Sequence, residues 1–252
     1  MLFQTDYCFR RTSGVNPHCE FRKDVTDVVF TRYIRLNGAH QLFLDCSRVT
    51  LVSPENFNQL GVCKSLQYLD VSFTAIQDLS IITANLSELR ALNLAGLSMK
   101  TWEPLKYLTT LESLSLRFSA KVTNRAVEPI KHFLRLRSLD LGHTEVSDVS
   151  FCKSLTRLEE LVLDGSKMGL SMSTTIDTGN DHSEGDEEDE VISLLSTLPS
   201  LRVLNICDTA WHHQHHHQHQ SQREGIPPTL YIEKQNRELL LLQAIMDRNT
   251  TM

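Results

Sequence analysis

The chain has 252 residues, of which 40% are hydrophobic, 22% charged and 7% aromatic, and its formal net charge is −6. These proportions are typical of one folded domain, and no apolar run approaches the roughly 20 residues that a membrane-spanning helix needs. The first residues, from Met1 to Asp6, form neither the basic nor the apolar part of a secretion signal. We therefore expect an intracellular location, in the cytoplasm or the nucleus, and no membrane partner.

The cysteines support the same expectation. They are scattered, without CxxC spacing, at Cys8, Cys19, Cys46, Cys63, Cys152 and Cys207. This distribution is typical of reduced thiols that pack in a core rather than of a disulfide framework.

Residues 1–35 precede the regular part of the sequence. We predict that this N-terminal capping segment covers one open end of an apolar core. Its apolar stretch from Val25 to Ile34 fits a helix or a degenerate strand, because short apolar runs do not separate the two.

From residue 36 to residue 210 the chain repeats one pattern, with apolar residues at the first, fourth and sixth positions and Ser, Thr or Leu at the ninth. A weak copy is formed by Ala39, Leu42 and Leu44, and clear copies begin at Leu66, Leu89, Leu111, Leu136, Leu158 and Leu201. The leading positions are 27, 23, 22, 25, 22 and 43 residues apart. Such a recurrence indicates a stack of similar structural units.

Each copy predicts a short strand, because its fourth and sixth residues point to the same side. Pro54, Pro104 and Pro129 lie between the copies, on segments that return the chain, where a missing N–H disrupts no sheet. We predict an α/β solenoid of about seven repeats with a curved parallel sheet on its concave face. The alternative is an ordinary α/β domain with leucine-rich strands.

Over about 170 residues, from Ala39 to Thr209, the pattern resembles the leucine-rich repeat family. The segments LQYLDVSFTAIQDLS and LRSLDLGHTEVSDVS resemble its short intracellular class. VTNRAVEPIKHFLRLRSLDL resembles repeats of F-box substrate receptors, and LPSLRVLNI resembles the last repeat of phosphatase-regulatory and spliceosomal relatives. The resemblance implies protein binding, not a reaction.

The residues that alternate with the inward leucines should form the binding surface. We predict that it is mildly acidic and binds a protein partner with basic character, not nucleic acid. The candidate contact residues are Phe43, Asp45, Tyr68, Asp70, Asn93, Arg117, Asp140, Glu160, Asp164 and Asn205.

An acidic insertion separates the last two copies. Residues 171–190 contain eight Asp or Glu residues and no Lys or Arg, so the rest of the chain would carry a net charge of +2. We predict that this insertion is disordered. It is either a solvated loop or a docking element for a basic partner.

Two further segments follow the repeats. Residues 211–228 form a His/Gln-rich linker, which contains six of the eleven histidines between His212 and His219. We expect low-complexity sequence there rather than a metal site, because no Cys partner or fixed second shell is spaced to close one. Residues 229–252 predict a C-terminal helix and tail, which cap the stack or contact another chain.

No common catalytic motif is present, so we expect no enzyme activity and no cofactor. The sequence predicts an intracellular scaffold or regulatory subunit that binds a protein through its concave face. Two alternatives stay open: the substrate-recognition subunit of a ubiquitin ligase, and a metal- or thiol-dependent enzyme that uses the His tract or Cys207.

Overall fold

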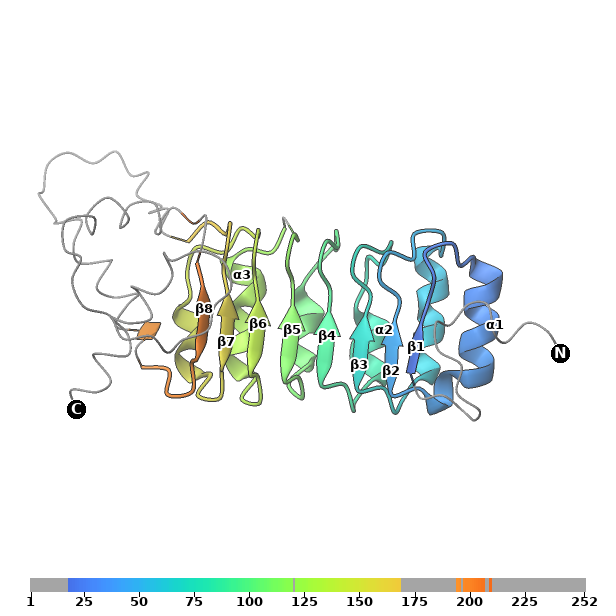
Figure 1. Cartoon of the computed structure of the whole chain (residues 1–252), viewed down its shortest axis with the longest axis horizontal. Helices are drawn as coiled ribbons and strands as arrows, with labels where there is room; N and C mark the ends of the chain where they lie inside the picture. The colour runs from blue at the N-terminus through green and yellow to red at the C-terminus, as the bar shows by residue number, and fades with distance from the viewer. Residues whose placement is uncertain (1–17, 120, 169–193, 196, 207–208, 210–252) are drawn as a thin grey trace, which may run out of the picture.

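The computed structural model describes residues 18–119, 121–168, 194–195, 197–206 and 209 (Figure 1). Within them, eight short strands lie side by side in chain order and form one sheet (Figure 1). Each strand pairs in parallel with the next. The predicted solenoid with a parallel sheet is confirmed. The strands are β1 His18–Glu20, β2 Phe43–Asp45, β3 Tyr68–Asp70, β4 Ala91–Asn93, β5 Ser113–Ser115, β6 Ser138–Asp140, β7 Glu160–Val162 and β8 Val203–Asn205.

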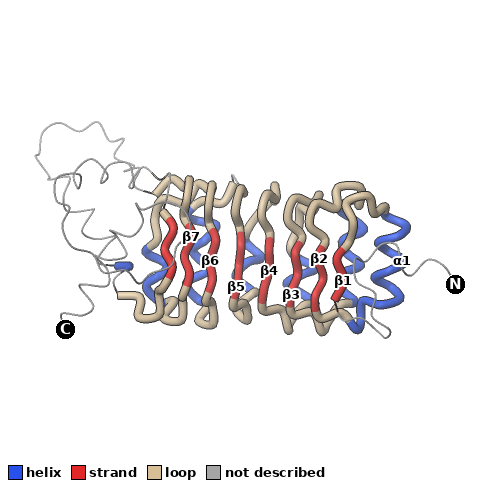
Figure 2. The backbone as a smooth tube through the Cα atoms, viewed as in Figure 1, coloured by secondary structure: helices blue, strands red, loops and turns tan. Residues whose placement is uncertain are grey.

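The segments that return the chain carry short helical turns behind the sheet, as Figure 2 shows. Most are 3-10 helices, and Pro54, Pro104 and Pro129 stand at the first turns of three of them, where a missing N–H has no partner to lose. The helices are α1 Asp27–Asn37, η1 Gly38–His40, η2 Pro54–Val62, α2 Ser80–Asn85, η3 Glu103–Tyr107, α3 Asn124–Val127, η4 Glu128–His132 and η5 Ser150–Ser154.

The N-terminal part contains both a strand and a helix. The stretch around Val25 to Ile34, which fitted either element, forms α1, whose Phe30 and Ile34 are buried. Strand β1 precedes it and pairs with β2, with Cys19 opposite Leu44. Cys19 and Phe21 are buried, so this part contributes one more repeat than the seven that the sequence predicts.

The weak first copy has a different register from the predicted one. Leu44 lies opposite Leu69, the fourth residue of its own copy, whereas the sequence analysis placed Leu44 at the sixth position. The leading residue is therefore Gln41, which is 1% exposed, while Leu42 is 38% exposed. The prediction was wrong by two residues because it favoured a leucine over a buried glutamine.

The core is a single column of aliphatic side chains that runs through all repeats. The central residue of each strand and the residue two positions later are buried in every repeat. At the ninth position, hydroxyls are buried because they bond to backbone carbonyl groups: Thr144 Oγ1 donates to Leu141 O at 2.6 Å, and Thr209 Oγ1 donates to Ile206 O at 2.7 Å. These bonds satisfy polar groups at the turn that would otherwise lie unpaired in the core.

We expect Leu114→Ala to lower the free energy of unfolding by about 2–5 kcal/mol, because the buried Leu114 would leave a cavity between repeats. Its neighbour on the outer side of the same strand provides the control: Ser113→Ala should change stability by less than about 0.5 kcal/mol. Urea denaturation followed by circular dichroism measures both. Equal effects of the two changes would contradict the inward position of Leu114.

Candidate functional site

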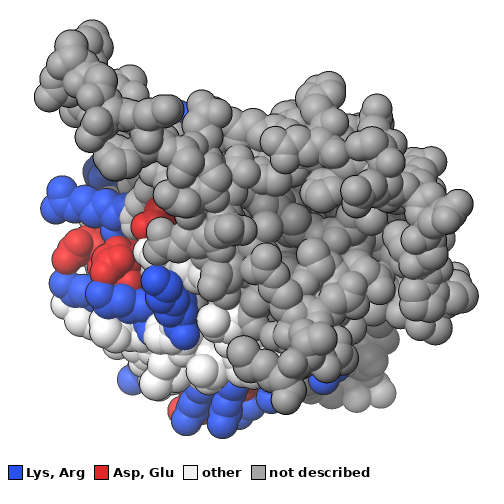
Figure 3. All heavy atoms as spheres, turned by 90° about the vertical axis from the view of Figure 1, so that its left-hand side faces the viewer, with Lys and Arg blue, Asp and Glu red and all other residues white. Residues whose placement is uncertain are grey.

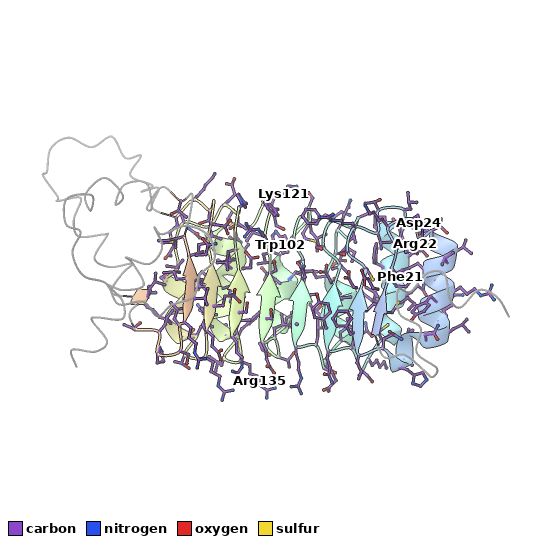
Figure 4. All side chains as sticks on the ribbon, in the orientation of Figure 1. Phe21, Arg22, Asp24, Trp102, Lys121 and Arg135 are labelled. Carbon is purple, nitrogen blue, oxygen red and sulfur yellow. The ribbon has the colours of Figure 1, made fainter. Side chains whose placement is uncertain are left out.

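The outward side chains of the eight strands form a continuous surface, here called the sheet face. All ten candidate contact residues lie on it or on the turns that directly follow the strands. Nine are partly exposed, and Asp70 is 7% exposed. The strands all run in one direction, so the sheet face has an upper rim after the strands, near Lys121, and a lower rim before them, near Arg135 (Figure 4).

At the N-terminal end of the sheet face, two aromatic rings stack beside a row of carboxylates. Phe43 and Tyr68 are opposite each other on β2 and β3, with ring centroids 4.0 Å apart and an angle of 5° between the planes. Asp45 and Asp70 are the next outward residues on the same two strands. Glu20, on β1, is in register with Asp45. These five residues are called the acidic-aromatic patch.

The hydroxyl of Tyr68 lies in the negative field of this patch. Burial raises the pKa of Tyr68 to about 12, and the charges of Asp70 and Asp45 add to the increase. A negative potential opposes formation of a phenolate for the same reason that it favours a bound cation.

The acidic residues of the sheet face also hold the turns that follow the strands. Asp45 Oδ1 accepts the N–H of Ser47 at 2.7 Å, Asp70 Oδ1 that of Ser72 at 2.8 Å, and Asp140 Oδ1 that of Gly142 at 3.0 Å. Asn93 does the same for Ala95 at 3.0 Å. Since an amide serves here as well as a carboxylate, the turn needs an acceptor oxygen and not a charge.

Toward the C-terminal end, Arg117 crosses the sheet face. Arg117 lies two residues after the end of β5. Its Nη1 and Nη2 donate to Asp164 Oδ1 and Oδ2, at 2.6 and 2.5 Å. Its Nη1 also lies 3.4 Å from Asp140 Oδ1. The hydrogen bonds to Asp164 are the main reason that the pKa of Arg117 is raised. Arg117 thereby forms ion pairs with two of the acidic candidates and offsets one of their two negative charges.

Gly142 makes this crossing possible. It stands in the row between Arg117 and Asp164, and a Cβ there would lie 2.3 Å from Arg117 Nη1 and 2.7 Å from Asp164 Oδ1. Ala95 occupies the equivalent position after β4, so the backbone itself does not require glycine. The glycine is needed because the guanidinium passes over it.

The structure thus separates the ten candidates into groups. Phe43, Tyr68, Asp45 and Asp70 come together, and Arg117 joins Asp140 and Asp164. Asn93 connects toward the first group, since its Nδ2 donates to Asp70 Oδ2 at 2.7 Å. Glu160 accepts a hydrogen bond from Ser138 Oγ at 2.8 Å, and Asn205 lies on β8; neither of these two joins the acidic-aromatic patch.

A row of residues on the upper rim was not predicted from the sequence. The row contains Arg48, Phe73, Phe118 and His143, which each follow a strand and have positive φ angles of 58°, 54°, 58° and 54°. Gly96 and Gly165 occupy the equivalent positions of other repeats, with φ of 67° and 62°. Two glycines at one position of the repeat were the signal in the sequence that could have identified this row.

The lower rim carries a chain of alternating charges. Glu112 lies between Arg90 and Arg137, at 3.4 and 3.9 Å, and Glu159 lies 2.6 Å from Arg137. Blue and red side chains are neighbours on the visible edges of the end-on view in Figure 3. Because these pairs are exposed, each contributes little to stability.

Several predicted features lie outside the described residues: the acidic insertion 171–190, the His/Gln-rich linker 211–228, the C-terminal segment 229–252, and Cys207. In the described part, no group of three or more His, Cys, Asp or Glu side chains is arranged to hold a metal ion. None of the helices described is both long and apolar enough to cross a bilayer.

Comparison with known proteins supports the architecture. Residues 62–82 match the family model described as Leucine Rich repeat. No curated protein matches the sequence at a significant level.

Among solved structures, the internalin inlF of Listeria monocytogenes aligns with a TM-score of 0.56 at 20% identity, over 76% of this chain and 47% of that protein. Internalin C2 of the same species gives 0.53 at 20%, over 75% and 80%. A leucine-rich repeat protein of Leptospira interrogans gives 0.50 at 24%, over 71% and 45%. The chain spans about half the length of the first and third of these proteins. At these identities the similarity shows a shared fold.

We expect Gly142→Ala to lower the free energy of unfolding by about 1–3 kcal/mol, because the added methyl group displaces Arg117 from Asp164. In an Arg117→Ala background the same change should cost less by about 1 kcal/mol or more, as in a double-mutant cycle between residues in contact. Thermal and urea unfolding of the four proteins measures the coupling. Additive effects would show that Gly142 serves the backbone rather than the ion pair.

Proposed function

Since the chain has the leucine-rich repeat fold, we propose that it is a protein-interaction module, and that its acidic-aromatic patch binds a basic, extended segment of a partner protein. Solenoids of this kind present long open surfaces that suit macromolecular partners. The observation that carries the proposal is the distribution of charge along the sheet face. Arg117 forms ion pairs with Asp140 and Asp164 at one end, whereas among the described residues no Lys or Arg pairs with Asp45 or Asp70 at the other end.

Two features of the patch favour a cationic side chain. Asp45 is partly exposed and uses one carboxylate oxygen for a turn N–H. Asp70 is buried, and its two oxygens accept from Ser72 N and Asn93 Nδ2, so it adds negative potential to the patch without direct contact. The stacked rings of Phe43 and Tyr68 provide π-electron density beside these carboxylates, to which a guanidinium or ammonium group is attracted. Arg22, which follows β1, is engaged by Asp24 at 3.1 Å and does not neutralise these carboxylates.

The regular register supports an extended partner. Outward residues recur on each strand at the same level, with Glu20, Asp45 and Asp70 in one row. Neighbouring strands are about 4.8 Å apart, so a peptide that crosses them meets one side chain of the row at each strand. Acidic character of the sheet face also disfavours nucleic acid, whose phosphates would be repelled.

We propose an intracellular location, in the cytoplasm or the nucleus. The described cysteines Cys19, Cys46, Cys63 and Cys152 are all buried, as expected of thiols that pack in a core. Burial raises the pKa of Cys63 to about 12 and also raises the pKa of Cys152, which keeps both thiols protonated and supports a non-enzymatic role. The ubiquitin-ligase alternative rests on the sequence resemblance alone.

Charge-neutral variants at the two ends of the sheet face test the proposal. The probe is a fluorescently labelled synthetic peptide in which Arg alternates with Ser, and fluorescence anisotropy measures its affinity. We expect Asp45→Asn to weaken binding about three- to tenfold at low salt, since one ion pair is lost. The turn should persist, because Asn93 shows that an amide oxygen accepts the same bond.

Glu160→Gln is the matched control, since it removes an equal charge from the other end of the sheet face. It should leave the affinity unchanged within error. The acidic insertion is present in every protein compared, so its contribution cancels. Equal losses in the two variants would show that the peptide senses net charge only, and the proposed site would be wrong.

A further inference from the structure

The rings of Phe73, Phe118 and His143 form a second exposed feature, here called the upper-rim ledge. Phe73 is 40% exposed and Phe118 is 48% exposed. The ring centroids of Phe73 and Phe118 are 6.2 Å apart, and those of Phe118 and His143 are 4.7 Å apart at an angle of 12°. Three rings from separate repeats therefore make one aromatic surface.

These residues occupy a backbone conformation that favours glycine. Their φ angles lie between 54° and 58°, where a Cβ is crowded by its own backbone and a bulky residue is strained. Gly96 and Gly165 stand at the equivalent positions, which shows that the turn itself does not require a side chain. Arg48 has the same conformation at the equivalent position, with a φ of 58°, so the strain is shared by the whole row. The exposure and the stacking of the three rings, rather than the strain, point to a use other than forming the turn.

The glycines complete the ledge. A Cβ on Gly96 would lie 2.3 Å from the ring of Phe73, and one on Gly165 would lie 2.4 Å from the ring of His143. Each ring thus covers the glycine of the following repeat. Because the rings fill the space above these glycines, the row presents a continuous surface instead of separate side chains.

Cations border this face. The guanidinium of Arg48 lies 5.8 Å from the centroid of Phe73, and that of Arg117 lies 4.9 Å from the centroid of Phe118. Arg117 is already paired with Asp164, and His143 Nε2 lies 3.4 Å from the same carboxylate. Arg48, and Lys121 on the upper rim (Figure 4), form no ion pair with a described residue. The charge available to a partner along the ledge is therefore positive.

We propose that the upper-rim ledge binds an extended protein segment in which an aromatic side chain is flanked by Asp or Glu. The aromatic group would pack against Phe73 and Phe118 in an edge or offset arrangement, and the carboxylates would pair with Arg48 and Lys121. This surface differs in charge from the acidic-aromatic patch, so the two would bind different segments. The inference does not depend on the proposed function of that patch.

The test uses a library of random short peptides displayed on phage and selected on the intact protein, with the enriched sequences then synthesised. Peptides that combine an aromatic residue with Asp or Glu should be enriched. Their affinity, measured by fluorescence anisotropy, should fall about tenfold or more for Phe73→Asn/Phe118→Asn, as for loss of a central contact. Asn is tolerated at positive φ, so the turns should remain folded.

Tyr107→Asn/Leu134→Asn is the control, because both side chains are exposed apolar groups away from the ledge. It should bind the same peptides with unchanged affinity. Arg48→Glu/Lys121→Glu leaves the rings in place, and should weaken the acidic peptides without lowering the melting temperature. This variant keeps the test decisive if Phe73→Asn/Phe118→Asn melts early.

Three results would overturn the proposal. Selection could enrich no aromatic-acidic class, or the enriched peptides could bind all variants equally. Sedimentation could show a dimer that Phe73→Asn/Phe118→Asn converts to a monomer, in which case a second copy of the chain covers the ledge.

Discussion

The whole molecule depends on burial of one column of leucine-type side chains by strands that pair in a fixed parallel register. No single repeat covers its own apolar side, so each is stable only between two neighbours. A shift by one residue would turn the buried side chains outward, and the pairing Leu44, Leu69, Leu92, Leu114 across β2 to β5 prevents it. The register of these buried side chains also fixes which surface residues lie next to each other in every other row.

That order is what gives the sheet face its chemistry. Because equivalent residues stack at constant spacing, one substitution in one repeat places a charge or a gap at a defined point along the row. Arg117, Gly142 and Asp164 are successive members of one such row: a cation, a gap and an anion. The guanidinium spans the gap, and the sheet face is thereby divided into an end where an arginine pairs with two aspartates and an acidic end without such a pair.

Structural and binding roles overlap in the same side chains. Asp45, Asp70 and Asp140 hold the turns after their strands through one carboxylate oxygen, so their presence alone is no sign of a binding site. Asn93 performs the turn function without a charge. The negative charge, which Asp has and Asn lacks, is not needed for the turn and is therefore the part of the side chain that could serve binding. This charge matters most at the end of the sheet face that Arg117 does not reach.

The sequence by itself determined the repeat, the strands and the direction in which their side chains alternate, because side chains buried at regular intervals are apolar at the same intervals in the sequence. It also marked six strands with the correct centres, from Leu69 to Leu204. It placed the first copy two residues out of register and did not find β1, because Gln41 and Cys19 stand where leucines stand elsewhere and their burial depends on neighbouring repeats.

Only the tertiary structure decided which outward residues meet. Arg117 and Asp164 are 47 positions apart in the sequence, and the ring over Gly96 comes from the preceding repeat. Both contacts join different repeats, and a pattern within one repeat carries no information about them. Side-chain reach and backbone φ set these contacts. They distinguish an acidic-aromatic end, an ion-paired end and an aromatic rim on a surface that the sequence describes as one mildly acidic face.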